Sequence, residues 1–421
     1  MHSKSTIFPM IIIGILFFIF GFVTWLNGSL IPFLKVICDL NEFQALFVTF
    51  SFYIAYTVMA LPMSFMLEKT GYKNGMAIGL GVMVVGSLVF IPAALDANFI
   101  LFLVALFTLG TGLTILQTAS NPYVVLIGPI ESAAMRISIM GLINKSAGVL
   151  VPLLFTSLIL ADIPSLSSEN IVSIDLQELA SRLITPYIIM AVVLSGLIVL
   201  VKFSSIPELE FEKKDDYDKD TIFHFPRVVL GAIALFFYVG IEVIAGDTIG
   251  LYAQSLGVEN ATALTSYTMV FMVFGYLVGV AFIPKFLSQE KALMTSALVG
   301  ILLLLGVAFS SSTSHEISTL LWGWSSIPTL PNTVTFVALL GFANALVWPT
   351  IWPLALEGLG KYTAQGSALL IMAIAGGAIL PLVFGKIAQV SGDMQSSYLV
   401  GLVCYFFIFM YAIKWHKKSI W

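Results

Sequence analysis

Residues 109–152 read LGTGLTILQTASNPYVVLIGPIESAAMRISIMGLINKSAGVLVP. It holds two long apolar segments joined by a short turn that carries Glu131 and Arg136. Lys145 lies about 13 Å from Arg136 along the second segment, because a helix rises about 1.5 Å per residue. That depth is near the middle of a hydrocarbon core about 30 Å thick. An ammonium group there should face a protein interior and have a carboxylate partner.

The composition indicates a membrane protein with many spans. The chain has 421 residues, of which 59% are hydrophobic and 10% charged. Its mean hydropathy is +1.02, whereas soluble domains carry about 25% charged residues. The first apolar run, residues 7–34, is too long for the core of a cleavable signal peptide. With two cysteines, Cys38 and Cys404, no disulfide framework is indicated.

Hydropathy predicts an all-α fold with twelve transmembrane helices. The segments at 161–183 and 205–225 are polar and are predicted to be loops. The second contains the charge run ELEFEKKDDYDKD and follows the sixth span, which is typical of a solvated linker. We therefore predict a six-helix bundle at 1–204, a linker at 205–225 and a second six-helix bundle at 226–421. The predicted spans are 8–36, 41–67, 74–96, 99–128, 132–160, 184–204, 226–256, 261–285, 291–310, 333–357, 362–388 and 394–415.

The distribution of basic residues predicts the orientation. Of the 19 lysines and arginines, 15 fall on the side that carries both termini and the linker, and three fall on the other side. Lys145, inside the membrane, completes the count. By the positive-inside rule, both termini and the linker are cytoplasmic. These basic residues sit at helix ends and form no patch, so we expect no nucleic-acid partner.

The two halves repeat in sequence, which is typical of secondary transporters with a substrate site between the halves. Three pairs of stretches align without gaps: 15–30 with 234–249, 116–122 with 343–349, and 145–152 with 374–381. In this alignment Lys145 corresponds to Ile374, Gln117 to Asn344, and Asp247 to Gly28.

Two carboxylates fall clearly inside a predicted span, Glu242 and Asp247 of the seventh. They are five positions apart, or about 140° around a regular helix, so both cannot face one cavity without a distortion. We expect one of them to pair with Lys145 across the two halves. Such a pair could couple ion movement to rocking of the halves, or it could be a fixed structural ion pair. If the pair couples ion movement to rocking, the ion could be Na⁺ bound at Asp247.

Amide and indole side chains inside the spans predict a sugar site. Asn344, Trp348 and Trp352 are four positions apart and would share one face of a regular helix. An indole ring offers an apolar face to a sugar ring, and amides bind its hydroxyl groups. Trp25 and Trp352 are equally well explained as interfacial anchors. The other candidate sugar ligands are Asn27, Gln44, Gln117, Asn121 and Asn144.

No pattern of a soluble enzyme is present. GLGVMVVG in the third span resembles a dinucleotide loop but has no strand before it, so packing glycines are the better interpretation. The four histidines lie outside the predicted spans, and no phosphate-binding loop for ATP occurs. We therefore expect a transporter without a cofactor, driven by a gradient, that acts as a monomer in the lipid bilayer.

The loop FMLEKTGYKNG, residues 65–75, resembles a degenerate form of the loop signature of the major facilitator superfamily. Glu68, Lys69, Gly71 and Lys73 hold its positions, which implies a gating loop. The blocks FGFVTWLNGSLIPFL, YVGIEVIAGDTIG and NALVWPTIWPLALEGLGK resemble the bacterial glucose/galactose transporters of the fucose–proton symporter family. The resemblance implies two pseudo-symmetric bundles, alternating access and monosaccharide uptake driven by a cation.

The chain departs from the fucose permeases of that family. Their first-helix Asp and fourth-helix Glu correspond here to Gly28 and Gln117, and their fifth-helix Asn corresponds to Lys145. We therefore predict an inner-membrane symporter for a neutral hexose, glucose or galactose first, with Na⁺ or H⁺ as the coupled ion. The alternatives are a symporter for fucose or another monosaccharide, an antiporter for drugs or organic anions, and a sugar sensor that does not transport.

Overall fold

The twelve predicted spans are present as helices. This computed structural model describes residues 7–126, 133–160, 175–208, 221–283, 286–418 and 421. In that part of the chain, 12 helical segments are long and apolar enough to cross a membrane. The same residues contain no β-strand. The fold is therefore all-α, as predicted.

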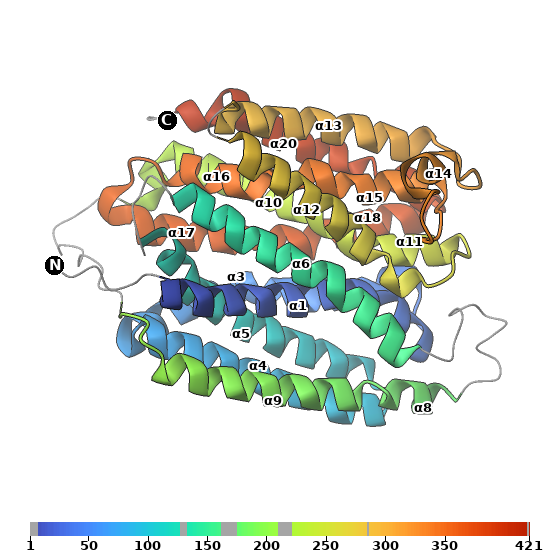
Figure 1. Cartoon of the computed structure of the whole chain (residues 1–421), viewed down its shortest axis with the longest axis horizontal. Helices are drawn as coiled ribbons and strands as arrows, with labels where there is room; N and C mark the ends of the chain where they lie inside the picture. Colours follow the sequence, from blue (N-terminus) through green and yellow to red (C-terminus); the bar gives the residue numbers. More distant parts are fainter. Residues whose placement is uncertain (1–6, 127–132, 161–174, 209–220, 284–285, 419–420) are drawn as a thin grey trace.

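The first half forms the lower layer of Figure 1, where α4 packs on α5 and α9, α3 on α5, and α1 on α6. Its helices are α1 (Ile7–Ile37), α2 (Glu42–Ala45), α3 (Phe47–Thr70), α4 (Tyr72–Leu95), α5 (Phe99–Leu126), α6 (Ala133–Ile159), α8 (Leu176–Ser181) and α9 (Ile184–Phe203).

The second half forms the upper layer, where α10 packs on α18 and α20, and α15 on α12 and α13. Its α-helices are α10 (Pro226–Asp247), α11 (Ile249–Ser255), α12 (Thr265–Phe282), α13 (Gln289–Phe309), α14 (Glu316–Trp322), α15 (Asn332–Asn344), α16 (Val347–Leu356), α17 (Thr363–Met372), α18 (Gly376–Ser391), α19 (Met394–Ser397) and α20 (Val400–Ile413). Short 3₁₀ turns occur at Ile222–His224, Ala261–Ala263, Gly360–Tyr362, Ala373–Ala375 and Trp415–Lys417.

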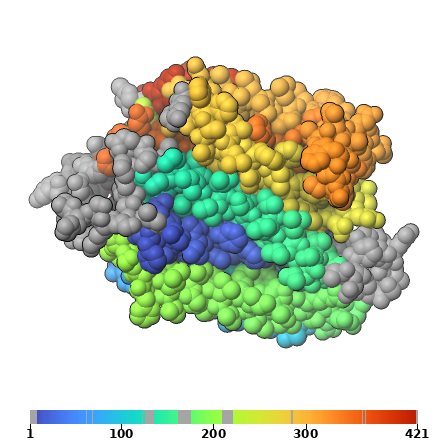
Figure 2. Space-filling view, in the orientation of Figure 1, coloured from blue at the N-terminus to red at the C-terminus, as the bar shows by residue number. Residues whose placement is uncertain are grey.

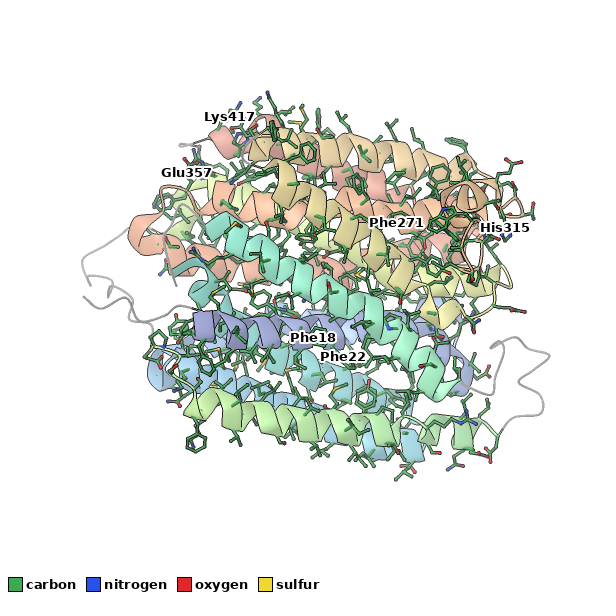
Figure 3. All side chains as sticks on the ribbon, viewed as in Figure 1. Phe18, Phe22, Phe271, His315, Glu357 and Lys417 are labelled. Carbon is green, nitrogen blue, oxygen red and sulfur yellow. The ribbon has the colours of Figure 1, made fainter. Side chains whose placement is uncertain are left out.

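The most extensive contacts between the halves are those of α6 with α12 and of α3 with α18. Figure 2 shows the first pair running along the boundary between the halves. The start of α1 and the C-terminal residue lie at one end of the molecule, which we call the termini end (Figure 1). Glu357 and Lys417 lie toward that end, and His315 lies at the opposite end, which we call the far end (Figure 3).

Local sequence explains where several helices begin and end. Asn41 and Gln44 form a reciprocal capping box at the start of α2. Asp175 and Asp393 cap α8 and α19 by accepting hydrogen bonds from free backbone N–H groups. Gly71, between α3 and α4, has a φ of +81°, a conformation that side chains disfavour.

Apolar side chains cover the outer surface, as a lipid environment requires. On α9, Ile189 is 58% exposed and Val192 is 66% exposed. Large contiguous apolar surfaces are rare on soluble proteins and are typical of surfaces that contact lipid.

The structure corrects several of the predicted spans, among them the eleventh, which is interrupted at Ala373–Ala375. A short helix, α8, occupies part of the segment 161–183 that was predicted to be a loop. The seventh span ends at Asp247 and continues as the separate helix α11, and the tenth is divided into α15 and α16. Of the predicted linker 205–225, residues 209–220 lie outside the described part of the chain.

Candidate functional site

A cavity of about 120 Å³ lies between the two halves. The residues that line it lie mostly on the parts of the helices nearer the termini end, such as Gln117 and Asn121 late in α5, and Ile137 early in α6. The remaining lining residues are Phe17, Phe20, Thr24, Trp25, Tyr53, Tyr56, Val124, Gly141, Asn144, Lys145, Tyr238, Val239, Glu242, Tyr276, Trp348, Trp352 and Ile374. The cavity therefore draws on both halves, and the repeat partners Lys145 and Ile374 both line it.

Lys145 and Glu242 form an ion pair across the boundary between the halves. The Lys145 Nζ lies 2.7 Å from the Glu242 Oε1, and each side chain is 9% exposed. The Tyr238 hydroxyl donates to the same carboxylate oxygen at 2.7 Å. The Lys145 Nζ also lies 4.2 Å from the centre of the Trp25 ring, within cation–π range. The lysine stranded in the membrane thus has its carboxylate partner on the seventh span, and that partner is Glu242.

Three predicted amides lie at the cavity: Gln117, Asn121 and Asn144. The Gln117 Nε2 donates to the Tyr56 hydroxyl at 3.0 Å. The Asn144 Oδ1 accepts from the Trp25 Nε1 at 3.3 Å, and its Nδ2 donates to the carbonyl of Phe17 at 3.4 Å. These bonds hold Gln117 and Asn144 in place at the cavity.

Aromatic rings form much of the remaining wall. Trp348 and Trp352, both predicted, have ring centres 5.4 Å apart. Trp348 also lies 6.4 Å from the ring of Tyr238, which carries the hydroxyl bonded to Glu242. Ring faces next to amides are the surfaces that a sugar requires, because its C–H groups are apolar and its hydroxyl groups are not.

Two predicted sugar ligands do not line the cavity. Gln44 is exposed and uses its side chain in the capping box with Asn41. Asn344 is fully buried inside the second half, where its Oδ1 accepts from the Tyr405 hydroxyl at 2.8 Å. The prediction for Asn344 assumed a regular helix through Trp348, but α15 ends at Asn344 and α16 begins at Val347. The break between the two helices separates Asn344 from the tryptophan face.

Asn27 and Asp247 lie beyond the cavity lining, toward the far end. Both are buried, at 1% and 0% exposure, and their side-chain polar atoms have no hydrogen-bond partner among the described residues. Glu242 lines the cavity and Asp247 does not, as the angle of about 140° between them predicts. No group of three or more His, Cys, Asp and Glu side chains in the described ranges could hold a metal ion.

The sequence interpretation missed the tyrosines of the cavity. Tyr53, Tyr56, Tyr238 and Tyr276 line it, and Tyr53 and Tyr56 stack at 6.3 Å. A signal was available, because Tyr53 and Tyr56 are three positions apart in the middle of a span, away from the interfaces where tyrosine is common.

The predicted gating loop lies at the termini end between α3 and α4. The Lys73 Nζ donates to the carbonyl of Ser204, at the end of α9, at 2.7 Å. The Glu208 carboxylate accepts from the backbone N–H groups of Tyr72 and Lys73. Lys69 is exposed, and the side chain of Glu68 is outside the described part of the structure. The loop is therefore tied to the start of the segment that links the halves.

Comparison with known proteins decides the family. The sequence matches the Major Facilitator Superfamily over residues 13–382. The chain belongs to the major facilitator superfamily. A glucose/galactose transporter of Brucella abortus biovar 1 (strain 9-941) is 32% identical over 423 residues, which cover 99% of this chain and 96% of the relative. An L-fucose-proton symporter of Escherichia coli (strain K12) is 27% identical and covers 98% and 94%.

Solved structures give the same fold. The crystal structure of the E. coli fucose:proton symporter superposes with a TM-score of 0.75 at 25% identity, over 99% of this chain and 100% of that one. A crystal structure of the same transporter in the outward conformation gives a TM-score of 0.74 at 26% identity, with the same coverage. The predicted fold and family are confirmed. The family and these relatives are transporters, so the prediction that the chain is not an enzyme is confirmed as well.

Proposed function

We propose that this protein imports a neutral hexose, glucose or galactose first, together with a cation. The relatives named as glucose/galactose transporters match almost the whole chain and support the substrate class. We place the protein in a bacterial inner membrane as a monomer, with both termini and the linker in the cytoplasm. The excess of basic residues on that side supports the orientation.

The observation that carries the proposal is the charge balance of the cavity. Lys145 is neutralised by Glu242 at 2.7 Å, so the lining groups left for a ligand are amides, hydroxyls and aromatic rings. Such a set suits an uncharged polyol. An organic anion would need a free positive charge, so the ion pair argues against the anion antiporter.

Alternating access then follows from the arrangement of the halves. The cavity lies nearer the termini end, and in the proposed orientation that end faces the cytoplasm. Rocking of the halves about a central sugar would close this end and open the far end. Because Lys145 and Glu242 belong to different halves, this motion changes their separation, and sugar binding beside them is thereby linked to the conformational change.

The proposed coupled ion is Na⁺ or H⁺. The fucose-proton symporters among the relatives support a proton. However, Gln117 and Gly28 stand where the fucose permeases carry acids. Within the described ranges, Glu242 and Asp247 are the buried carboxylates that could respond to an ion.

Uptake into proteoliposomes tests the proposal. We expect accumulation of labelled glucose or galactose under an inward Na⁺ gradient or pH gradient, and competition by unlabelled hexoses but not by organic acids. Fucose as the better competitor would favour the fucose alternative, and binding without flux would identify a sensor.

Asp247→Asn should retain hexose counterflow and lose accumulation. If Asp247→Asn and Glu242→Gln both still accumulate hexose against its gradient, the coupling role of these carboxylates is excluded.

A further inference from the structure

Three buried side chains near the far end of the cavity have unused oxygen atoms. Asn27 of α1, Thr49 of α3 and Asp247 of α10 are each at most 1% exposed. The Asn27 amide, the Thr49 hydroxyl and both Asp247 oxygens have no hydrogen-bond partner in the described part of the protein. An unsatisfied buried polar group costs about 1–3 kcal/mol, and a charged group more. Three of them on three adjoining segments indicate a ligand.

These side chains continue the surfaces that line the cavity. On α1, Asn27 follows Phe20 and Thr24 at helical spacing, and both of those line the cavity. On α3, Thr49 precedes the lining residues Tyr53 and Tyr56 at the same spacing. From the cavity, both of these rows of side chains, on α1 and on α3, run toward the far end, where the halves are in contact.

Asp247 reaches the same place from the second half. It follows Val243 by four positions and so shares its side of α10. Gly377 of α18 lies against both Val243 and Tyr53, so this side of α10 faces α3. The Thr49 hydroxyl lies beside the Asp247 carboxylate without the geometry of a hydrogen bond, and Tyr53 also lies close to Asp247.

The turn of α1 that carries Asn27 lies against the end of α10. Gly28 leaves no room for a Cβ, which would lie 2.1 Å from the Thr265 Oγ1. The same Thr265 hydroxyl donates to the carbonyl of Gly246, the residue before Asp247, at 2.8 Å. Asn27 and Asp247 are therefore on neighbouring turns of packed helices.

The electrostatics at this place favour a cation. Asp247 is the last residue of α10, at the end where the helix dipole is negative and a carboxylate is unfavourable. Glu242 and Lys145 neutralise each other, so these two groups and Asp247 leave a single net negative charge. One monovalent cation balances it, and a divalent cation would leave an excess.

We propose that Asp247, Asn27 and Thr49 bind a small monovalent cation of the Na⁺ type. Hard cations prefer oxygen ligands, and one carboxylate with an amide oxygen and a hydroxyl oxygen supplies them. A proton on Asp247 would let that carboxyl donate to one neighbouring oxygen, and the other oxygens would remain unused. As the coupled ion this cation deepens the proposed function, and the assignment moves Asn27 from the sugar site to the cation site.

Binding of the ion alone tests the site separately from transport. The full-length protein in nanodiscs, without sugar, is titrated with NaCl against choline chloride at constant ionic strength and pH, and its melting temperature is recorded. We expect a saturable rise of a few degrees, because a ligand of the folded state stabilises it. Labelled Na⁺ should bind with the same midpoint.

Variants identify the ligands. Asp247→Asn should abolish the Na⁺ response, and Asn27→Ala and Thr49→Val should each weaken it at least about tenfold, whereas Thr49→Ser should restore it. Thr114→Val is the control, because its buried hydroxyl is bonded to its own helix at 2.8 Å. This variant should respond as the wild-type protein does.

Three results would overturn the cation site. Equal responses to Na⁺ and choline, a response that Asp247→Asn retains, or stabilisation by acid with none by Na⁺ would exclude it. Should hexose uptake proceed under a pH gradient while Na⁺ neither binds nor stabilises the protein, the proposed function would stand and the Na⁺ site would fail. Should Na⁺ bind as described without hexose flux, the site would stand and the proposed function would fail.

Discussion

At the scale of single residues, the buried ion pair is the feature on which the cavity depends. Lys145 comes from the first half, Glu242 from the second, and their charged atoms lie 2.7 Å apart. Either group left alone inside the membrane would be an uncompensated charge. Tyr238 and Trp25 complete the surroundings of the pair by a hydrogen bond and a cation–π contact.

Removing one partner should therefore be more harmful than removing both. We expect Lys145→Met or Glu242→Gln alone to lower the free energy of unfolding by about 3–5 kcal/mol. The double variant should recover much of that loss, because no unpaired charge remains. Thermal unfolding of the two single variants and the double variant measures this coupling. Additive losses would show that the two groups do not stabilise each other.

A second residue-scale prediction separates binding from stability. Gln117→Ala should weaken hexose binding by about tenfold, as loss of one hydrogen bond predicts, with little effect on the melting temperature. Asn344→Ala is the matched comparison, because it leaves the buried Tyr405 hydroxyl without its acceptor. It should lower stability by about 1–3 kcal/mol and leave hexose affinity unchanged. Equal effects of the two variants on affinity would return Asn344 to the sugar site.

At the scale of helices, breaks in three spans fall beside the functional residues. The seventh span breaks after Asp247, and the tenth breaks between Asn344 and Val347. The eleventh breaks at Ala373–Ala375, where Ile374 lines the cavity. Interrupted backbone inside a membrane is stable only where protein or a polar cavity satisfies it. These breaks mark the part of the second half that surrounds the site.

Helix α4 depends on an acceptor from outside the helix. Its first N–H groups donate to the Glu208 carboxylate, near the start of the linker. Glu208→Gln should reduce this interaction by about 0.5 kcal/mol, because a negative charge at a helix N-terminus is favourable. Amide hydrogen exchange in the first turn of α4 should then become faster. Glu259→Gln, an exposed acid at the other end of the molecule, is the control, and equal exchange in both variants would contradict the prediction.

At the scale of the whole molecule, the two halves are joined by hydrogen bonds at the far end. The Ser29 hydroxyl donates to the carbonyl of Thr262 at 2.7 Å. The Thr156 and Thr262 hydroxyls lie 2.7 Å apart, and Ser266 donates to the carbonyl of Val149 at 2.7 Å. With the cavity nearer the termini end, this is the arrangement of a transporter closed at its far end.

A disulfide should lock this state. The double variant Thr156→Cys/Thr262→Cys places two thiols where the two hydroxyls now touch. Oxidation should then join the halves and abolish hexose uptake, and a reductant should restore the uptake. Native Cys38 should not interfere, because burial raises the pKa of its thiol to about 11 and keeps it protonated at neutral pH. Either single cysteine variant is the control. Full uptake by the oxidised double variant would show that the far end need not open.

Much of this protein follows from the sequence alone. Hydropathy determines the number of spans because a bilayer requires about 20 apolar residues for each helix. The cost of burying charge identifies Lys145, Glu242 and Asp247 as the groups that need partners. Helical spacing predicts that Gln117 lies beside Asn121 and Trp348 beside Trp352, because their helices are regular there; Asn144 was predicted only as an amide inside a span.

Which of these groups meet depends on how distant helices pack in the folded protein. Spacing along one helix cannot tell whether Lys145 pairs with Glu242 or Asp247, because that depends on how two distant helices pack. It also cannot foresee that a break after Asn344 removes that amide from the cavity, or that Gln44 is used as a cap. Contacts across the halves are set by three-dimensional packing, and so the ion pair, the tyrosines of the cavity wall and the unused oxygens at its far end emerge only from the folded chain.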